Sequence, residues 1–156
     1  FFCEANRYAE LSPYETHVPL TNIADRATAY DMPGVTIDGG DVVAVYETMV
    51  EAVARARNNL GPSLVEAKTY RWHGHYEGDP QSYKPEGETE AERARDPIRR
   101  FEIVVKERFG IDDEAIKAVH ADEKMVIDAA VQFAEASADP KPDALTANVY
   151  ASEAGA

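Results

Sequence analysis

A strand, a helix and a second strand, joined by short links, occupy residues 35–70 and constrain the fold more than any other feature of the sequence. Residues 35–37 are all β-branched, which favours a strand, and Gly39 and Gly40 then turn the chain. Asp41 is placed to cap the helix that follows. In that helix the apolar side chains fall at helical spacing on one face, which comprises Val42, Tyr46, Met49, Val50 and Val53.

The second strand of this unit follows the helix closely. The helix is expected to end near Asn58 and Asn59, because Gly61 and Pro62 block its continuation. Residues 63–70 are then expected to form the next strand. Two strands joined through a helix by short links form a right-handed crossover onto a parallel sheet. The sequence therefore predicts an α/β fold, with part of a parallel sheet and flanking helices.

The first thirty residues are expected to add a strand and a short helix. Residues 1–4 have the character of a short buried strand, and residues 5–20 are polar and broken by two prolines, which predicts a loop. Residues 22–30 form a helix candidate with Thr21 or Asn22 as its N-cap.

The chain after residue 95 is expected to be helical. Asp96 followed by Pro97 marks the start of a helix, and Gly110 ends it. Its apolar face comprises Ile98, Phe101, Val104, Val105 and Phe109. A longer helix begins at Asp112 or Asp113 and ends at the proline-containing residues 139–142.

In this longer helix Ile116, Val119, Val126, Ile127, Ala130 and Phe133 are expected to face inward. The stretch 145–150 is expected to pair as an edge strand or simply to pack on the domain.

The first residues are unusual for a chain terminus, which is ordinarily polar and exposed. The sequence lacks an initiator Met and opens with two phenylalanines in a strand-like run. We therefore expect the chain to be a fragment cut inside a domain. A processed mature protein is the alternative.

The charge balance limits the classes of partner. The net charge is −13 and the pI is about 4.6, whereas nucleic-acid binding needs a basic surface. The longest apolar runs are too short for a membrane span. The single cysteine, Cys3, cannot form an internal disulfide and is expected to be a small buried apolar group. These features predict a cytoplasmic location, with no nucleic acid and no membrane as partners.

A cluster of polar and aromatic residues leaves the predicted strand that ends at Tyr70. Arg71, His73 and His75 lie within five residues, and Gly74 lets the backbone pass close to a ligand. Because ligands bind outside the carboxyl ends of strands in such sheets, this loop is a candidate phosphate site. A surface loop with incidental histidines is the alternative. A zinc site is disfavoured because no third ligand stands out beside His73 and His75.

Asn6 lies just past the first predicted strand. Its side-chain amide and a nearby free carbonyl are oxygen ligands of the kind that Mg²⁺ binds. An asparagine after a strand is also a common turn residue, and that interpretation stays open.

Taken together, these segments resemble the alpha subunits of thiamine-diphosphate-dependent 2-oxo acid dehydrogenases, the pyruvate and acetoin dehydrogenase type. In that family a cofactor motif opens with Gly-Asp-Gly and closes with Asn-Asn after a strand. Residues 3–9 resemble the closing part, whereas the opening part is absent. The resemblance covers essentially all 156 residues, and it continues through residues 24–27, 32–35, 38–42, 61–71, 74–75, 79–80, 83, 96–98 and 145–150.

The resemblance implies a site with named roles. Asn6 would give a side-chain ligand to Mg²⁺, and Tyr8 a backbone carbonyl ligand. Arg71 and His75 would bind the diphosphate of the cofactor, and His75 would also be the catalytic residue near the reacting centre. Residues 1–95, with their site loop 71–90, would be the C-terminal part of the cofactor-binding domain, and residues 96–156 its helical extension.

The implied activity is that of an oxidoreductase subunit in a complex. It would decarboxylate or cleave a 2-oxo acid or acetoin, and pass the acyl group to a lipoyl-bearing acyltransferase. A beta subunit, joined in a heterotetramer, would supply the activating glutamate, so an isolated fragment is expected to be inactive. The run 75–81 resembles the acetoin branch more than the pyruvate branch.

Two departures from the family pattern matter. Ala5 replaces the first Asn of the closing motif, and Tyr76 stands where mitochondrial relatives carry a phosphorylated Ser, although Ser82 occupies a place like a secondary site. A non-catalytic subunit-interaction remnant that no longer binds the cofactor is therefore the alternative function. A transketolase-like enzyme is disfavoured, because its typical sequence around the His-containing loop is not seen.

Overall fold

The computed structural model describes residues 1–147 and 149. The chain divides into two compact units, the first ending at Gly110 and the second beginning at Ile111. Within the described residues, no helix has both the length and the apolar character needed to span a membrane.

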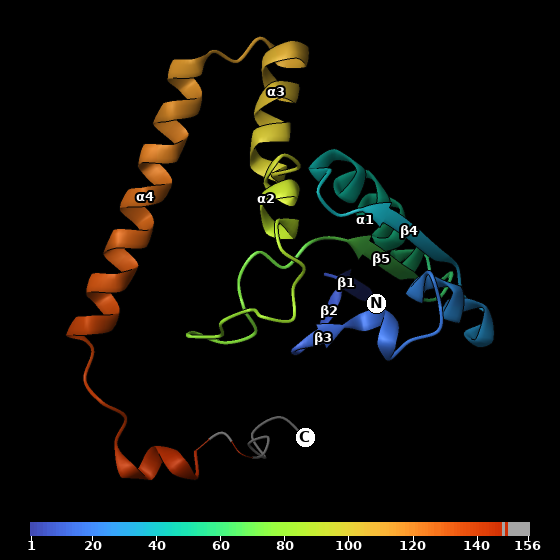
Figure 1. The fold of residues 1–156 in the computed structure, drawn as a ribbon, viewed down its shortest axis with the longest axis horizontal. Helices are drawn as coiled ribbons and strands as arrows, with labels where there is room; N and C mark the ends of the chain where they lie inside the picture. Colours follow the sequence, from blue (N-terminus) through green and yellow to red (C-terminus); the bar gives the residue numbers. More distant parts are fainter. Residues whose placement is uncertain (148, 150–156) are drawn as a thin grey trace. The chain divides into compact units, whose positions relative to one another are not determined.

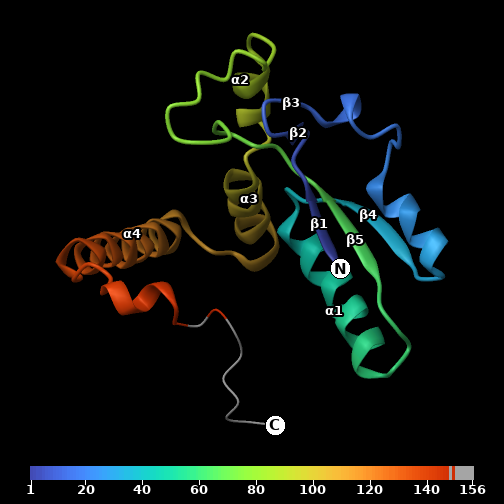
Figure 2. The ribbon, with the colours of Figure 1, turned by 90° about the horizontal axis from the view of Figure 1, so that it is seen from below.

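A three-stranded parallel sheet forms the centre of the first unit. β5 (Leu64–Lys68) lies between β1 (Phe2–Ala5) and β4 (Gly34–Asp38) and pairs with both in parallel. The three strands run side by side in Figures 1 and 2. The parallel pairing expected from the strand, helix and strand is confirmed, and the carboxyl ends of all three strands meet at one edge of the sheet.

The middle of β5 carries a fully buried carboxylate. The Glu66 side chain is 0% exposed, and its Oε2 atom accepts hydrogen bonds from the Ala24 amide and the Thr36 hydroxyl, both at 3.0 Å. A buried charge is costly unless it is hydrogen-bonded, so these donors must come together when β5 forms. Glu66 thereby joins β5 to β4 and to the helix η2 (Ile23–Tyr30).

The helix expected over residues 22–30 is present as the 3₁₀ helix η2, but it is not capped as expected. The Asn22 side chain makes no capping bond, and its Oδ1 atom instead accepts a hydrogen bond from Lys68 Nζ at 2.7 Å. The acceptor for the first turn of η2 is Glu66. Gly34 is needed beside η2, because a Cβ at that position would collide with the Ala24 carbonyl oxygen.

The helix between β4 and β5 is α1 (Val42–Arg57). Asp41 caps it as expected, since its Oδ1 atom accepts hydrogen bonds from the Val43 and Ala44 amides at 3.0 and 3.1 Å. The apolar face marked by the sequence is largely exposed, with Tyr46 69% exposed. A different face of α1, which includes the half-buried Val45, is the more covered one.

The segment expected to be a loop between residues 5 and 20 contains a small hairpin. β2 (Tyr8–Ala9) pairs antiparallel with β3 (Ser12–Pro13), and the 3₁₀ turn η1 (Tyr14–Thr16) follows. Arg7 and Glu10 have φ values of 72° and 50°, so two left-handed residues bend the chain around β2. Polar composition and prolines gave no sign of this pairing.

Two helices follow the loop after β5. α2 (Glu88–Arg93) was not expected from the sequence, whereas α3 (Pro97–Phe109) was. Asp96 caps α3 through the Ile98 amide at 2.9 Å, and Gly110 ends it with a φ of 67°. Both end signals of α3 are confirmed.

The second unit contains the long helix α4 (Asp113–Ala136) and the 3₁₀ turn η3 (Pro142–Leu145). Asp112 caps α4 through the Ala115 amide at 2.8 Å, as expected. The expectation that its apolar face points inward is not met, because the side chains of that face, apart from the half-buried Ile116, are exposed in the described chain. Leu145 belongs to η3 rather than to a strand, and residues 148 and 150 lie outside the described residues.

The first strand is less buried than the sequence suggested. Phe1 and Phe2 are 80% and 50% exposed, and Cys3 is half-buried. The expected burial of this strand is therefore wrong, because β1 is the outer strand of the described sheet and only β5 covers it. Partial burial, together with the nearby Glu66 charge, raises the pKa of the Cys3 thiol.

The buried carboxylate generates a stability prediction. We expect Glu66→Ala to lower the free energy of unfolding by about 3 kcal/mol, because the Ala24 amide and the Thr36 hydroxyl lose their acceptor. Urea titration followed by circular dichroism measures this change. Glu90→Ala is the matched control, since the Glu90 side chain is 83% exposed and its loss is expected to cost at most about 0.5 kcal/mol. Equal midpoints for the two variants would contradict the role assigned to Glu66.

Candidate functional site

The candidate site begins where β1 and β5 end beside each other. The Thr69 amide donates to the Ala5 carbonyl at 3.0 Å, and the Arg71 amide donates to the Asn6 carbonyl at 3.3 Å. Parallel pairing therefore continues past the strands and brings Asn6 and Arg71 together. Ligands in such sheets bind outside the carboxyl ends of the strands, which is where these residues lie.

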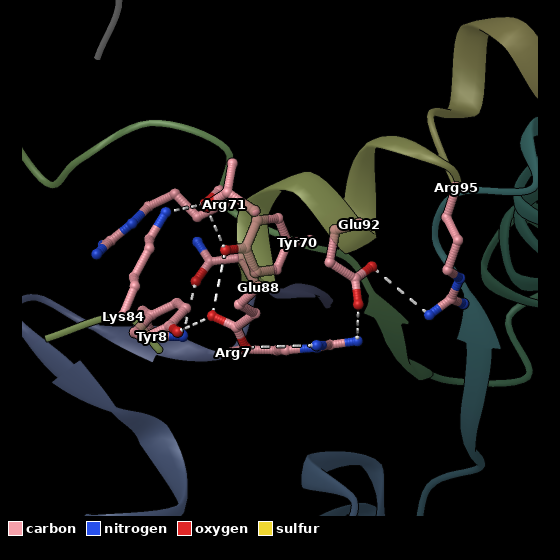
Figure 3. Close-up of polar contacts among 10 residues, drawn as sticks. Arg7, Tyr8, Tyr70, Arg71, Lys84, Glu88, Glu92 and Arg95 are labelled. Carbon is pink, nitrogen blue, oxygen red and sulfur yellow. Dashed lines mark hydrogen bonds and ion pairs between the residues drawn. The ribbon is translucent and has the colours of Figure 1, made fainter. Parts of the chain in front are cut away.

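Tyr8 lies at the centre of the site and is 9% exposed. Its ring meets those of Tyr70 and Tyr83 edge to face, with centroids 6.3 and 5.5 Å away. The Arg71 guanidinium and the Lys84 ammonium each lie 5.4 Å from its ring centroid. Aromatic faces attract cations, so Tyr8 helps to hold two positive charges close together (Figure 3).

The Tyr8 hydroxyl donates a short hydrogen bond to Glu88 Oε2, and the Tyr70 hydroxyl reaches the same oxygen at 3.2 Å. Burial, and then the hydrogen bond to the Glu88 carboxylate, raise the pKa of Tyr8. Both phenols therefore stay protonated at neutral pH and attach α2 to the strand ends.

Arg71 is fixed by two neighbours, and a buried donor of its guanidinium stays unused among the described residues. Its Nη2 atom donates to the Tyr83 hydroxyl at 2.8 Å and to the Glu10 carbonyl at 2.5 Å. The Nε atom is buried and has no hydrogen-bond partner in the described chain. A buried guanidinium donor without an acceptor suits an anionic ligand.

The loop after Trp72 is folded around one carboxylate. Asp79 accepts hydrogen bonds from the His75 amide at 2.7 Å, the Gln81 amide at 2.8 Å and the Tyr83 hydroxyl at 2.8 Å. Gly74 is required here, because a Cβ would overlap the Asp79 side chain. Desolvation raises the pKa of Asp79, but the two amides and Tyr83 outweigh it, so the pKa lies below its usual value.

Lys84 closes this loop onto the end of β5. Its ammonium donates to the Arg71 carbonyl at 2.6 Å, and to the Trp72 and His73 carbonyls at 3.3 and 3.4 Å. Burial, and then the neighbouring Arg71 charge, lower the pKa of Lys84. The backbone of residues 71–73 is thereby held in one conformation.

The structure brings together three of the four residues that the sequence predicted for the cofactor. Asn6, Tyr8 and Arg71 are mutual neighbours, whereas His75 lies further along the loop and is fixed through its backbone amide. The Asn6 Oδ1 atom accepts a hydrogen bond from the Tyr8 amide at 3.1 Å, so Asn6 also serves as a turn residue. Both interpretations of Asn6 are compatible with this geometry.

The described part of the chain contains no group of three or more His, Cys, Asp or Glu residues placed to hold a metal ion. The ligands expected from Asn6 and Tyr8 are a side-chain amide oxygen and a backbone carbonyl oxygen. Neither belongs to a His, Cys, Asp or Glu side chain, so the absence of such a cluster does not test them. The magnesium site therefore stays a prediction.

Sequence reasoning missed Lys84 and Glu88 as parts of the site. Glu88 bonds Tyr8 across 80 positions of the chain, and it belongs to a helix that the sequence did not indicate. Tyr83 and Asp79 were marked only through the family resemblance. No local signal in the sequence identifies Lys84 or Glu88.

Residues 1–143 match the family described as the dehydrogenase E1 component. The chain belongs to this family of dehydrogenase components, as its fold and its resemblance indicated.

Individual relatives support the assignment. The alpha subunit of the acetoin:2,6-dichlorophenolindophenol oxidoreductase of Bacillus subtilis is 44% identical over 154 residues, which is 97% of this chain and 45% of that protein. The 2-oxoisovalerate dehydrogenase subunit alpha of the same organism is 38% identical, with 97% and 46% covered. The pyruvate dehydrogenase E1 component subunit alpha of Porphyra purpurea is 32% identical, with 97% and 44% covered. The chain thus spans less than half the length of these relatives.

The Asp79 interactions generate a prediction about pH. The pKa of Asp79 in the folded chain lies below its ordinary value of 3.8. The stability that the ionised Asp79 gives to the loop is therefore fully present above the ordinary pKa, and it is lost as the pH falls through the folded-state pKa. We therefore expect the amides of His75 and Gln81 to stay protected at pH 5 and to lose protection below about pH 3.8. Hydrogen exchange read by mass spectrometry measures this, with α3 as an internal reference. Asp79→Asn removes the titrating group, and protection that still fell at the same pH in this variant would contradict the assignment.

Proposed function

We propose that this chain is part of the alpha subunit of a thiamine-diphosphate-dependent dehydrogenase that acts on a 2-oxo acid or acetoin. The proposal rests on one observation: a member of the E1 family places Asn6, Tyr8 and Arg71 together at the carboxyl ends of two adjacent parallel strands. The relatives named above act, by their names, on acetoin, 2-oxoisovalerate and pyruvate. Acetoin is the preferred substrate class because the acetoin relative has the highest identity of these three.

The residues present fit the diphosphate part of the cofactor. Arg71 has a buried Nε atom without an acceptor, and the Lys84 ammonium adds a second positive charge nearby. Asn6 Oδ1 uses one lone pair on the Tyr8 amide and keeps another for a metal. Asn6 and Tyr8 would hold Mg²⁺, and Arg71 and His75 would hold the diphosphate.

The cofactor, when bound, supplies the electron sink for decarboxylation or carbon–carbon cleavage. The chain's own residues supply binding and orientation. The Tyr83 hydroxyl and the Glu10 carbonyl fix Arg71, so its guanidinium loses little freedom when it meets a phosphate oxygen. His75, held through Asp79, would hold or donate a proton near the reacting centre.

The proposed partners follow from the family. A beta subunit would complete the active site in a heterotetramer, and a lipoyl-bearing acyltransferase would accept the acyl group. Residues 1–95 would belong to the cofactor-binding domain and residues 96–156 to its helical extension, in a cytoplasmic enzyme.

Calorimetry tests the cofactor site. Thiamine diphosphate with Mg²⁺ is titrated into the full-length alpha subunit containing this sequence, co-expressed with its beta subunit. We expect Arg71→Ala and His75→Ala each to weaken binding at least about tenfold, because each removes a charge-assisted hydrogen bond to phosphate. Arg99→Ala and His73→Ala are matched controls, since Arg99 is exposed on α3 and the His73 ring is not assigned to the site.

Two results would overturn the proposal. Binding that is equal in all variants would remove Arg71 and His75 from the site. No binding in the unmodified protein would favour the alternative, a non-catalytic subunit-interaction remnant of the same fold.

A further inference from the structure

The chain bends sharply between the two residues predicted to bind the metal. Arg7 separates Asn6 from Tyr8, and its φ of 72° lies in the left-handed region. This conformation costs a side chain other than glycine about 1–2 kcal/mol, so it persists only where surrounding contacts hold it. The bend determines how the Asn6 side chain and the Tyr8 carbonyl lie relative to each other. The contacts that hold the bend therefore also shape the predicted metal site.

Backbone hydrogen bonds hold only one side of this bend. The Arg7 carbonyl accepts a hydrogen bond from the Tyr14 amide at 3.0 Å, which ties the bend to the turn η1. Towards β5, the last backbone hydrogen bond in the described chain joins the Arg71 amide to the Asn6 carbonyl. Arg7 and Tyr8 lie beyond that bond, so among the described residues only side chains connect them to the segment that follows β5.

The carboxylate of Glu88 makes this connection (Figure 3). Its Oε2 atom accepts hydrogen bonds from the Tyr8 hydroxyl and, at 3.2 Å, from the Tyr70 hydroxyl, and its Oε1 atom lies 3.7 Å from Arg7 Nη1. The Glu88 side chain is only 22% exposed, and hydrogen bonds to a carboxylate that is largely removed from water are strong ones. One side chain of α2 thus joins the segment after β1 to the segment after β5.

The three side chains that meet this carboxylate are chain neighbours of the predicted cofactor ligands. Arg7 and Tyr8 directly follow Asn6, and Tyr70 directly precedes Arg71. The carboxylate therefore fixes the spacing between the segment predicted to hold the metal and the segment predicted to hold the diphosphate.

Tyr8 depends on Glu88 more than Arg7 does. Arg7 also pairs with Glu92, at 2.9 Å, so its guanidinium keeps an acidic partner when Glu88 is changed. The described chain offers the Tyr8 hydroxyl no acceptor besides Glu88. This hydroxyl is the end of the side chain furthest from the backbone carbonyl that is predicted to bind the metal. Glu88 therefore acts on that carbonyl through the Tyr8 side chain, without touching the ion.

We propose that Glu88 is a positioning residue for the metal ion, because through Tyr8 it holds the bend at Arg7 in the conformation that sets the Tyr8 carbonyl beside Asn6. This inference rests on the proposed function, in which Asn6 and Tyr8 hold Mg²⁺. Partners that orient metal ligands change metal affinity by about 10- to 100-fold when they are removed, although they do not touch the metal. Removal of Glu88 is therefore expected to weaken metal binding, and not only the attachment of α2.

Titration with Mn²⁺ tests the role of Glu88. Mn²⁺ takes the same oxygen ligands as Mg²⁺, and the electron paramagnetic resonance signal of the free ion reports how much is bound. The full-length alpha subunit that contains this sequence is titrated together with its beta subunit in saturating thiamine diphosphate, and a protein-free titration corrects for Mn²⁺ bound by the cofactor in solution. We expect Glu88→Gln and Tyr8→Phe each to raise the dissociation constant for Mn²⁺ about tenfold. Tyr8→Phe keeps the ring and the backbone carbonyl and removes only the hydroxyl that Glu88 binds.

The controls separate positioning from a loss of stability. Glu90→Gln removes a charge from an 83% exposed position of the same helix and is expected to leave Mn²⁺ binding unchanged. The double variant Tyr8→Phe with Glu88→Gln is expected to bind Mn²⁺ no more weakly than Glu88→Gln alone, because both changes break the same contact. Thermal unfolding without the metal measures stability by itself. A Glu88 that only attached α2 would lower the melting temperature of its variant and leave the dissociation constant for Mn²⁺ unchanged, which would overturn the proposal.

Asn6→Ala tests the proposed function separately, because it removes a predicted ligand and is expected to weaken Mn²⁺ binding about tenfold or more. If Asn6→Ala weakens binding whereas Glu88→Gln and Tyr8→Phe do not, the positioning role is wrong and the proposed function stands. If Glu88→Gln fails to fold, Tyr8→Phe decides alone. If Asn6→Ala leaves binding unchanged, or the unmodified protein binds no Mn²⁺, the metal site of the proposed function is wrong and the positioning role falls with it.

Discussion

The hydrogen bonds of one buried carboxylate determine how the first unit is assembled. Glu66 sits in the middle of the central strand β5, and its acceptor oxygen holds the Thr36 hydroxyl of β4 and the Ala24 amide of η2. The parallel register aligns Thr36 with Glu66, so the hydrogen bond forms only when β4 pairs correctly. A shift by one residue would place Thr36 on the opposite face and remove its hydrogen bond to the buried carboxylate. The register in turn sets where the strand ends lie, and with them the candidate site.

The features that the sequence predicted well are local ones. Asp41, Asp96 and Asp112 each accept hydrogen bonds from amides two or three residues ahead, and Gly110 supplies a left-handed ending. These signals depend only on neighbours in the chain. The parallel sheet was predictable for a similar reason, since short strands around one helix leave few other arrangements.

The features that the sequence did not predict depend on contacts across long separations. The hairpin β2–β3 follows from two left-handed residues, Arg7 and Glu10, neither of which is a usual choice for that conformation. α2 is held by Tyr8 and Arg7 through Glu88 and is too short to show a periodic pattern. Arg71 was identified from its place just after a predicted strand and from the family resemblance, whereas its partner Lys84 could be found only in three dimensions.

The apolar stripe along α4 has a thermodynamic consequence. Side chains such as Val126 and Phe133 are 62% and 77% exposed, whereas helices in proteins gain most of their stability from packing such a stripe against a neighbour. Any neighbour that covers these side chains will therefore stabilise the helix by mass action, by an amount that grows with the logarithm of its free concentration. The melting temperature of this part of the chain is consequently a property of the mixture in which it is measured, and it will rise as the covering surface becomes more abundant.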